Sequence, residues 1–327
     1  MLKRLKYLNK FFYKCEIFIP IIVSIYAYYI FNLSHSNWIM PVKYFTTDLL
    51  KGEGDRAFLQ RFLGPYVIIL IEKFSFSLET SYRIFIKFNF LVNALIFYYS
   101  MKKLNLNILK SSSYLIIYKF LICSYFGSLF YPWDFIDLWI YVIFLYLILK
   151  KKNIIVFVML FLFAMLNSDR ALIIPVYIAI NSITLIKKKF LPTNLNNFYL
   201  GLILLILGII YLYLIRIYIS PIKPGVTETI FGGYGFYLFR NIEHFLFKNW
   251  FSHNFFYQIT FVALTVYFIS SIYKFKEFQI KVFLIYLIKF SLVFTFGIIE
   301  EVRDFLFIIP TALFLFITIN EKNIKYN

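Results

Sequence analysis

Apolar runs of about twenty residues recur along the chain, and this pattern constrains the fold more than any other feature. A run of that length is what an α-helix needs to cross the hydrocarbon core of a membrane. The alternating strands of an outer-membrane barrel, about ten residues each, are not seen. With 61% hydrophobic and 23% aromatic residues among 327, the chain is not a soluble domain. We therefore predict an all-α polytopic membrane helix bundle, with residues 1–327 forming a single integral-membrane domain.

Basic residues set the predicted topology, because Lys and Arg are retained on the cytoplasmic side of a membrane. The basic tail 3–14 places the N-terminus inside, and helix 16–33 is expected to be an uncleaved anchor. The apolar run 62–77 decides the rest, because its crossing would export the next three lysine clusters. The run is short and contains Glu72 and Lys73, so we predict that it lies flat on the outer surface.

Nine more helices follow in this threading, near 83–100, 112–131, 134–149, 153–168, 171–186, 197–218, 254–272, 281–298 and 304–319. The prediction is therefore about ten transmembrane helices with both termini inside, and with interfacial helices in the first outer loop. The three spans between 134 and 186 are shorter than the roughly twenty residues of a full crossing. We expect them to leave a polar hollow at the outer surface.

The predicted topology separates the charges of the chain. All but three of the sixteen carboxylates fall outside, and the exceptions are Glu16, Glu277 and Glu321. Acids contribute little to topology, so this acidic face is not a by-product of orientation. The net charge of +18 is explained by lysines in short inner loops. We therefore expect membrane lipid, and no nucleic acid, as a partner.

The first outer loop holds Asp48, Glu53 and Asp55 within a short span of chain. A carboxylate near the membrane surface is what a general base needs to take a proton from a sugar hydroxyl. Arg56 and Arg61 follow, and a guanidinium is geometrically suited to phosphate. A solvated loop with ordinary surface charges is the alternative interpretation.

A second motif, Tyr-Pro-Trp-Asp-Phe-Ile-Asp, begins at Tyr131 and opens a predicted helix. Asp134 suits the first turn of a helix whatever its function, because the helix dipole favours an acid there. Asp137 lies one turn further on the same face, and capping does not explain it.

A third motif places Asp169 and Arg170 in the middle of the apolar stretch 153–186, which is bounded by lysine triplets. Lysines at both ends predict a hairpin with its tip outside. We predict that the two residues form a buried ion pair at this tip. Charges at such depth are costly and are usually functional.

A fourth motif lies between the last two predicted helices, where Glu300 and Arg303 are three residues apart. One helical turn would place these two together as an ion pair, and would also place Glu301 next to Asp304. Two adjacent carboxylates can raise one another's pKa, which suits acid–base catalysis.

Lysines inside helices are a separate matter. Lys119 is expected to snorkel to the inner surface. Lys289 lies mid-helix, and whether it pairs with a bundle acid stays open.

The remaining polar residues predict no further chemistry. The three histidines have no metal-ligand spacing, and no Walker-type or GxGxxG loop is present, so we expect no metal and no cofactor. Cys15 and Cys123 are expected at different depths, which predicts no disulfide. The glycines of segment 231–237 fit either a mobile lid over a lipid-linked substrate or an interfacial aromatic belt.

The order of these motifs resembles the GT-C-like family of bacterial membrane glycosyltransferases. The resemblance rests on the acid-bearing loop that leads into Arg61–Pro65, the Tyr-Pro-x-Asp element at Tyr131–Asp134, the hairpin tip Asn167–Arg170 and the Glu-x-x-Arg element Glu300–Arg303. Together these motifs cover most of the chain. The resemblance implies surface helices in the first outer loop and a polyprenyl-phosphate sugar as donor.

The implied function is transfer of a sugar from this lipid-linked donor to a cell-surface glycan or lipid acceptor, on the outer face of a bacterial cytoplasmic (inner) membrane. The catalytic base would be Asp48 or Asp55. The substrate-binding residues would be Arg56, Arg61, Asp134, Asp137, Asp169, Arg170, Glu300 and Arg303. Capsule and O-antigen polymerases are similar in size and would use outer arginines instead. A transporter or lipid flippase, with charges at mid-membrane and paired halves, is the alternative of a different class.

The topology is tested by single cysteines at Lys102, Lys151 and Lys188. If 62–77 does not cross, all three lie inside and resist an impermeant thiol reagent in intact cells, while a permeant reagent labels them. Labelling of any two from outside would overturn the predicted topology.

Overall fold

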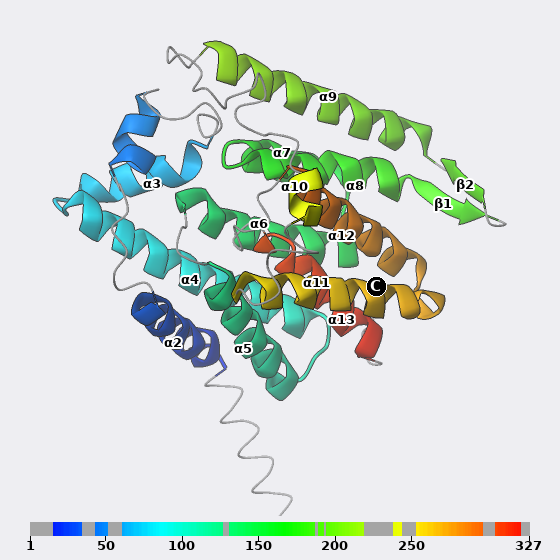
Figure 1. The fold of residues 1–327 in the computed structure, drawn as a ribbon, viewed down its shortest axis with the longest axis horizontal. Coiled ribbons are helices and arrows are strands. Elements are labelled where there is room, and N and C mark those ends of the chain that lie inside the picture. Colours follow the sequence, from blue (N-terminus) through cyan, green and yellow to red (C-terminus); the bar gives the residue numbers. More distant parts are fainter. Residues whose placement is uncertain are drawn as a thin grey trace, which may run out of the picture.

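The computed structural model describes residues 16–34, 43–51, 61–126, 131–186, 189–192, 194–218, 238–243, 253–296 and 305–321. This described part is a layered bundle of helices (Figure 1). The helices are α2 (Phe18–Ser34), α3 (Leu63–Glu72), α4 (Leu78–Lys103), α5 (Ile108–Tyr125), α6 (Pro132–Leu149), α7 (Ile154–Met165), α8 (Ile173–Asn181), α9 (Leu195–Tyr218), α10 (Leu238–Glu243), α11 (His253–Ser270), α12 (Glu277–Phe296) and α13 (Ile309–Asn320). Shorter elements are η1 (Tyr44–Asp48), η3 (Asp169–Leu172), η5 (Ile272–Lys274), β1 (Ile183–Ile186) and β2 (Lys189–Pro192).

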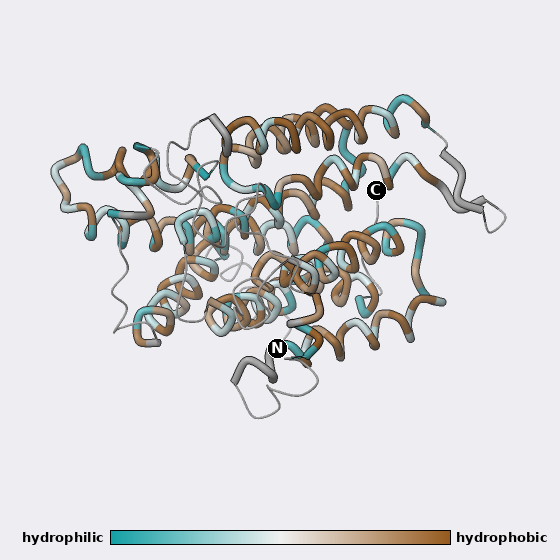
Figure 2. The backbone as a smooth tube through the Cα atoms, turned by 45° about the horizontal axis from the view of Figure 1, so that its top comes forward, coloured by the Kyte–Doolittle hydropathy of each residue, from teal (hydrophilic) through white to brown (hydrophobic). Residues whose placement is uncertain are grey.

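Four of the described helices are long and apolar enough to cross a membrane: α4, α6, and the segments Leu195–Ile215 of α9 and Glu277–Thr295 of α12. This is the character of a multi-pass helical membrane protein. Hydrophobic residues follow the helix bodies, and hydrophilic ones gather at helix ends and connections (Figure 2). The predicted count of ten spans is not confirmed by these four helices, and it stays a prediction.

The predicted span 171–186 is wrong in its second half. Helix α8 has nine residues and ends at Asn181. Its length of about 14 Å is roughly half the thickness of the hydrocarbon core. The following residues, Ile-Thr-Leu-Ile, include three β-branched side chains and form β1, which pairs antiparallel with β2 in the register Ile183↔Pro192. Helix α3 is also short, at ten residues, and the flat placement of 62–77 stays a prediction.

Helix α6 lies at the centre of the bundle and contacts α3, α4, α7 and α13. Of the residues of α6, 83% are buried, whereas only 22% are buried in the apolar segment of α9 at the edge of the bundle. Aromatic side chains fill the space between α6 and its neighbours, as in the stack of Phe135 on Phe126, whose ring centroids are 4.6 Å apart. The first turn of α6 is therefore buried inside the molecule.

The charges divide between the two ends of the bundle. The three acids expected inside each pair with a lysine at one end, which we call the lysine end: Glu16 with Lys102, Glu321 with Lys110, and Glu277 with Lys281. The opposite end, which we call the acidic end, holds the first turns of α4 and α6 and the turn between α7 and α8. The acids of α6 and of the hairpin, Asp134, Asp137 and Asp169, therefore lie at the opposite end of the bundle from Glu16, Glu277 and Glu321.

Helices α8 and α9 touch closely at Gly201, and this contact is testable. A Cβ at Gly201 would lie 2.6 Å from the Ala179 nitrogen and 2.8 Å from the Pro175 oxygen, both of them backbone atoms that cannot rotate away. Gly201→Val should lower the free energy of unfolding by about 1–3 kcal/mol, because overpacking forces the helices apart. The measurement is thermal unfolding of purified protein in lipid nanodiscs. Ile203→Val, at an exposed site on the same helix, is the matched control. Equal stability of the two variants would contradict the close contact.

Candidate functional site

The first turn of α6 begins the site. Pro132 suits this position because its missing N–H would have no partner inside the helix. The Asp134 carboxylate accepts a hydrogen bond from the backbone nitrogen of Tyr131, at 3.1 Å, as expected of a first-turn acid. Asp134 and Asp137 are both buried. The second acid lies one turn deeper, where capping does not account for it.

The hairpin of α7 and α8 brings its turn onto this part of α6. The Asn167 side-chain nitrogen donates to the Trp133 carbonyl at 2.9 Å and to the Asp137 carboxylate at 2.7 Å. The Ser168 hydroxyl accepts from the Arg170 backbone nitrogen at 3.0 Å and starts η3. The predicted hairpin is therefore present, with the Asp–Arg sequence at its turn.

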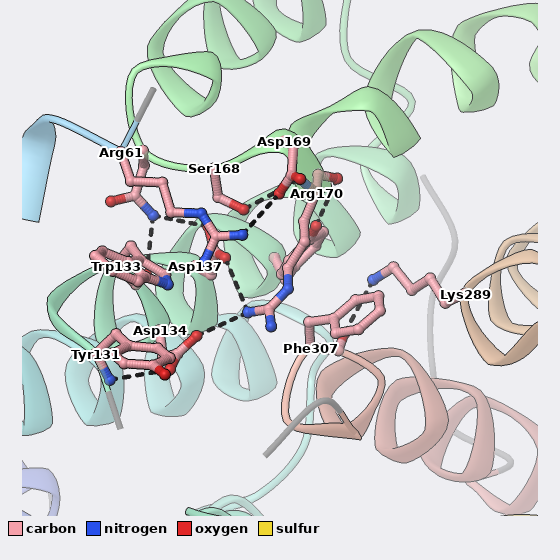
Figure 3. Close-up of polar contacts among 12 residues, drawn as sticks. Arg61, Tyr131, Trp133, Asp134, Asp137, Ser168, Asp169, Arg170, Lys289 and Phe307 are labelled. Atoms are coloured by element: carbon pink, nitrogen blue, oxygen red, sulfur yellow. Dashed lines mark hydrogen bonds and ion pairs between the residues drawn. The ribbon is translucent and has the colours of Figure 1, made fainter. Parts of the chain in front are cut away.

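Three ion pairs cross between elements at this point (Figure 3). The Arg170 Nη1 atom lies 2.8 Å from Asp134 Oδ1 and 3.3 Å from Asp137 Oδ2. The Arg61 Nη2 atom lies 3.3 Å from Asp169 Oδ1. The predicted pairing of Asp169 with Arg170 is wrong, because these neighbours point to different elements: Arg170 towards α6 and Asp169 towards Arg61. We call these five residues the ion-pair network.

The network is shielded from solvent to different degrees. The Asp134 side chain is 0% exposed, whereas those of Asp169 and Arg170 are each 15% exposed. Aromatic rings cover both guanidiniums, with Trp133 at 4.8 Å from Arg61 and Phe307 at 5.0 Å from Arg170. Buried ion pairs contribute little net stability, because desolvation offsets their attraction. Stability alone therefore does not explain the network.

The other predicted site residues fall into two groups. Asp48 ends η1, which packs against α3. In η1, Phe45 lies 4.5 Å from Tyr131 and 5.9 Å from Trp133, measured between ring centroids. The η1 segment therefore lies beside the start of α6. Asp55, Arg56, Glu300 and Arg303 lie outside the described residues.

Two of the described lysines are buried within helices. Lys119 does not snorkel: it is buried and donates to the Phe90 carbonyl and the Asn93 side chain, both at 2.8 Å. Lys289 makes no ion pair with an acid among the described residues. It donates instead to the Phe307 carbonyl at 3.1 Å and to the Thr311 hydroxyl at 2.9 Å.

Sequence reasoning missed Tyr141, whose hydroxyl donates to the Arg170 carbonyl at 2.7 Å. A signal was available, because Asp134, Asp137 and Tyr141 are spaced i, i+3 and i+7 and share one face of a helix. The described residues contain no cluster of His, Cys, Asp and Glu that would hold a metal ion.

Comparison of the chain with protein-family models, with curated proteins and with solved structures finds no match. Its function is therefore argued from the geometry of the network and its surroundings.

The largely buried pair of Arg61 and Asp169 is testable by removing one partner or both. Arg61→Met and Asp169→Asn should each lower the free energy of unfolding, by up to about 3–5 kcal/mol, because each removes one partner of an ion pair that is shielded from solvent. The double variant should lose less than the sum, as measured by thermal unfolding in nanodiscs.

The exposed pair of Arg83 with Glu79 is the matched control, with side chains 60% and 68% exposed. The same cycle there should show single effects of less than about 1 kcal/mol. Additive losses at Arg61 and Asp169, no larger than in the control, would show that the pair is not buried.

Proposed function

We propose that this chain is a membrane glycosyltransferase that moves a sugar from a polyprenyl-phosphate donor to a cell-surface glycan or lipid acceptor. In this proposal the acidic end faces outward from a bacterial cytoplasmic membrane, with ten spans and both termini inside. The observation that carries the proposal is the convergence of Arg61, Asp134, Asp137, Asp169 and Arg170 from three separate segments. Two arginines held by carboxylates at one end of an apolar bundle are suited to bind the phosphate of a lipid-linked substrate.

The carboxylates of the network would act by orienting the arginines. Asp134 and Asp137 hold the Arg170 guanidinium from one side, and Asn167 in turn holds Asp137. A cationic group held in place before the reaction stabilises charge without reorganisation during it. Arg170 and Asp169 keep the largest exposed fractions in the network, so a substrate would reach the turn of the hairpin first.

The proposed reaction is a displacement at the anomeric carbon of the sugar. A loop-one carboxylate, Asp48 or Asp55, takes the proton from the acceptor hydroxyl, whose oxygen forms the new bond to that carbon. The bond from the anomeric carbon to the phosphate oxygen breaks, and polyprenyl phosphate leaves with the bonding electrons. Arg56, Arg61 and Arg170 neutralise the charge of this leaving group. In this proposal Glu300 and Arg303, which lie outside the described residues, also bind the substrate.

A transporter of lipid or solute is the second candidate, and two observations favour it. Lys119 and Lys289 are buried inside helices, away from helix ends. The chain from α7 to α8 consists of short helical pieces, as in the broken helices of transporters. Purified protein in detergent separates the two functions: a glycosyltransferase forms a glycosidic bond there, whereas a transporter has no second compartment to fill.

The base is tested with labelled polyprenyl-phosphate sugar and acceptor. One of the two substitutions Asp48→Asn and Asp55→Asn should lower transfer by about 10²–10⁴-fold, because Asn keeps the shape but cannot accept the proton. Lys51→Gln and Glu53→Gln in the same loop are the matched controls and should keep near-normal transfer. Near-normal transfer by all four variants would exclude loop one as the source of the base.

A further inference from the structure

Lys289 is held in an unusual way for a lysine inside a membrane helix. It lies in the middle of α12 and is 0% exposed, so its amino group does not reach an aqueous surface. The Nζ atom is bound by the Phe307 carbonyl and the Thr311 hydroxyl, and it lies 3.7 Å from the centroid of the Tyr141 ring. The amino group is therefore held by two neutral oxygens and an aromatic face.

Two of the groups that hold Lys289 also contact Arg170. The Tyr141 hydroxyl donates to the Arg170 carbonyl, and the Phe307 ring lies 5.0 Å from the Arg170 guanidinium carbon. In Figure 3, Phe307 lies between the side chains of Arg170 and Lys289. Lys289 thus contacts the backbone carbonyl of Phe307 and the ring face of Tyr141, and both of these residues also contact Arg170. Tyr141 and Phe307 therefore connect Lys289 to Arg170 by direct contacts.

We propose that Lys289 is a positioning residue that fixes Arg170 in the orientation needed to bind a lipid-linked phosphate. The inference rests on the proposed function, in which Arg170 meets that phosphate. Lys289 does not touch the substrate in this scheme, because it is buried behind Tyr141 and Phe307. A purely structural role, fastening α12 to the start of α13, is the competing explanation.

The chain offers a matched control in Lys119. This lysine is also buried, and it also donates to a backbone carbonyl and a side-chain oxygen, but its partners are Phe90 and Asn93 on α4. Among its described contacts none involves Tyr141, Phe307 or Arg170. Replacement by Met removes the amino group and keeps the apolar stem in both positions.

The first measurement compares KM and kcat for a polyprenyl-phosphate sugar. Lys289→Met should raise the donor KM about tenfold with kcat changed much less, because a displaced guanidinium loses a charged hydrogen bond worth about that factor. Lys119→Met should leave the donor KM within about twofold of the wild type. An unchanged KM in Lys289→Met, or an equal rise in both variants, would overturn the positioning role.

The second measurement does not depend on activity. It compares the fold-changes in the unfolding equilibrium constant that Lys289→Met, Arg170→Met and the double variant cause. The fold-change of the double variant should differ from the product of the two single fold-changes by about fivefold or more, because the two residues share partners. The cycle of Lys119→Met with Arg170→Met should be multiplicative. A multiplicative result for Lys289 as well would overturn the inference.

The two measurements also separate this inference from the proposed function. If wild-type protein transfers no sugar, the proposed function fails, and the thermodynamic cycle alone decides whether Lys289 is coupled to Arg170. If Lys289→Met does not accumulate in the membrane, Tyr141→Phe replaces it in both measurements, because it removes only the hydroxyl that binds the Arg170 carbonyl.

Discussion

The structure depends on charges that are buried in pairs at one end of an apolar bundle. Arg170 lies against Asp134 and Asp137 in the first turns of α6, the helix most enclosed by its neighbours. An isolated charge buried there would raise the free energy of the folded state. The packing of the hairpin of α7 and α8 against α6 therefore depends on the pairing of these charges. Arg61 meets the same need for a partner, because it pairs with Asp169 and packs on Trp133. The packing of α3, α6 and the hairpin turn is therefore coupled to one set of ion pairs.

Much of this arrangement follows from patterns in the sequence. The lysine triplets on either side of 153–186 predicted a hairpin, and the structure confirms it. The motif at 131–137 predicted a helix start with a capping acid, and that is confirmed in the contact of Asp134 with Tyr131. Such features are local, because a turn or a cap depends on residues close together in the chain.

The partners of the charges could not be predicted in the same way. Asp169 and Arg170 are adjacent in the sequence, which suggested a pair, but the backbone of η3 directs them to different elements. One of the two hydrogen-bond partners of Lys289 is a backbone carbonyl eighteen residues away, and a backbone group has no side-chain signal in the sequence. The end of α8 was also missed, since β1 is as apolar as the helix before it. Long-range pairing depends on the packed fold, which periodicity does not determine.

The central claim is that the ion-pair network receives a lipid-linked phosphate at the acidic end of the bundle. The most direct measurement is photo-crosslinking of the purified protein in nanodiscs with a polyprenyl phosphate that carries a diazirine next to the phosphate. The account predicts crosslinks in the peptides around 131–141 and 166–172, which are lost on competition with unlabelled polyprenyl phosphate. Competed crosslinks at the lysine end, around 102–110 or 274–281, with none at the network, would contradict it.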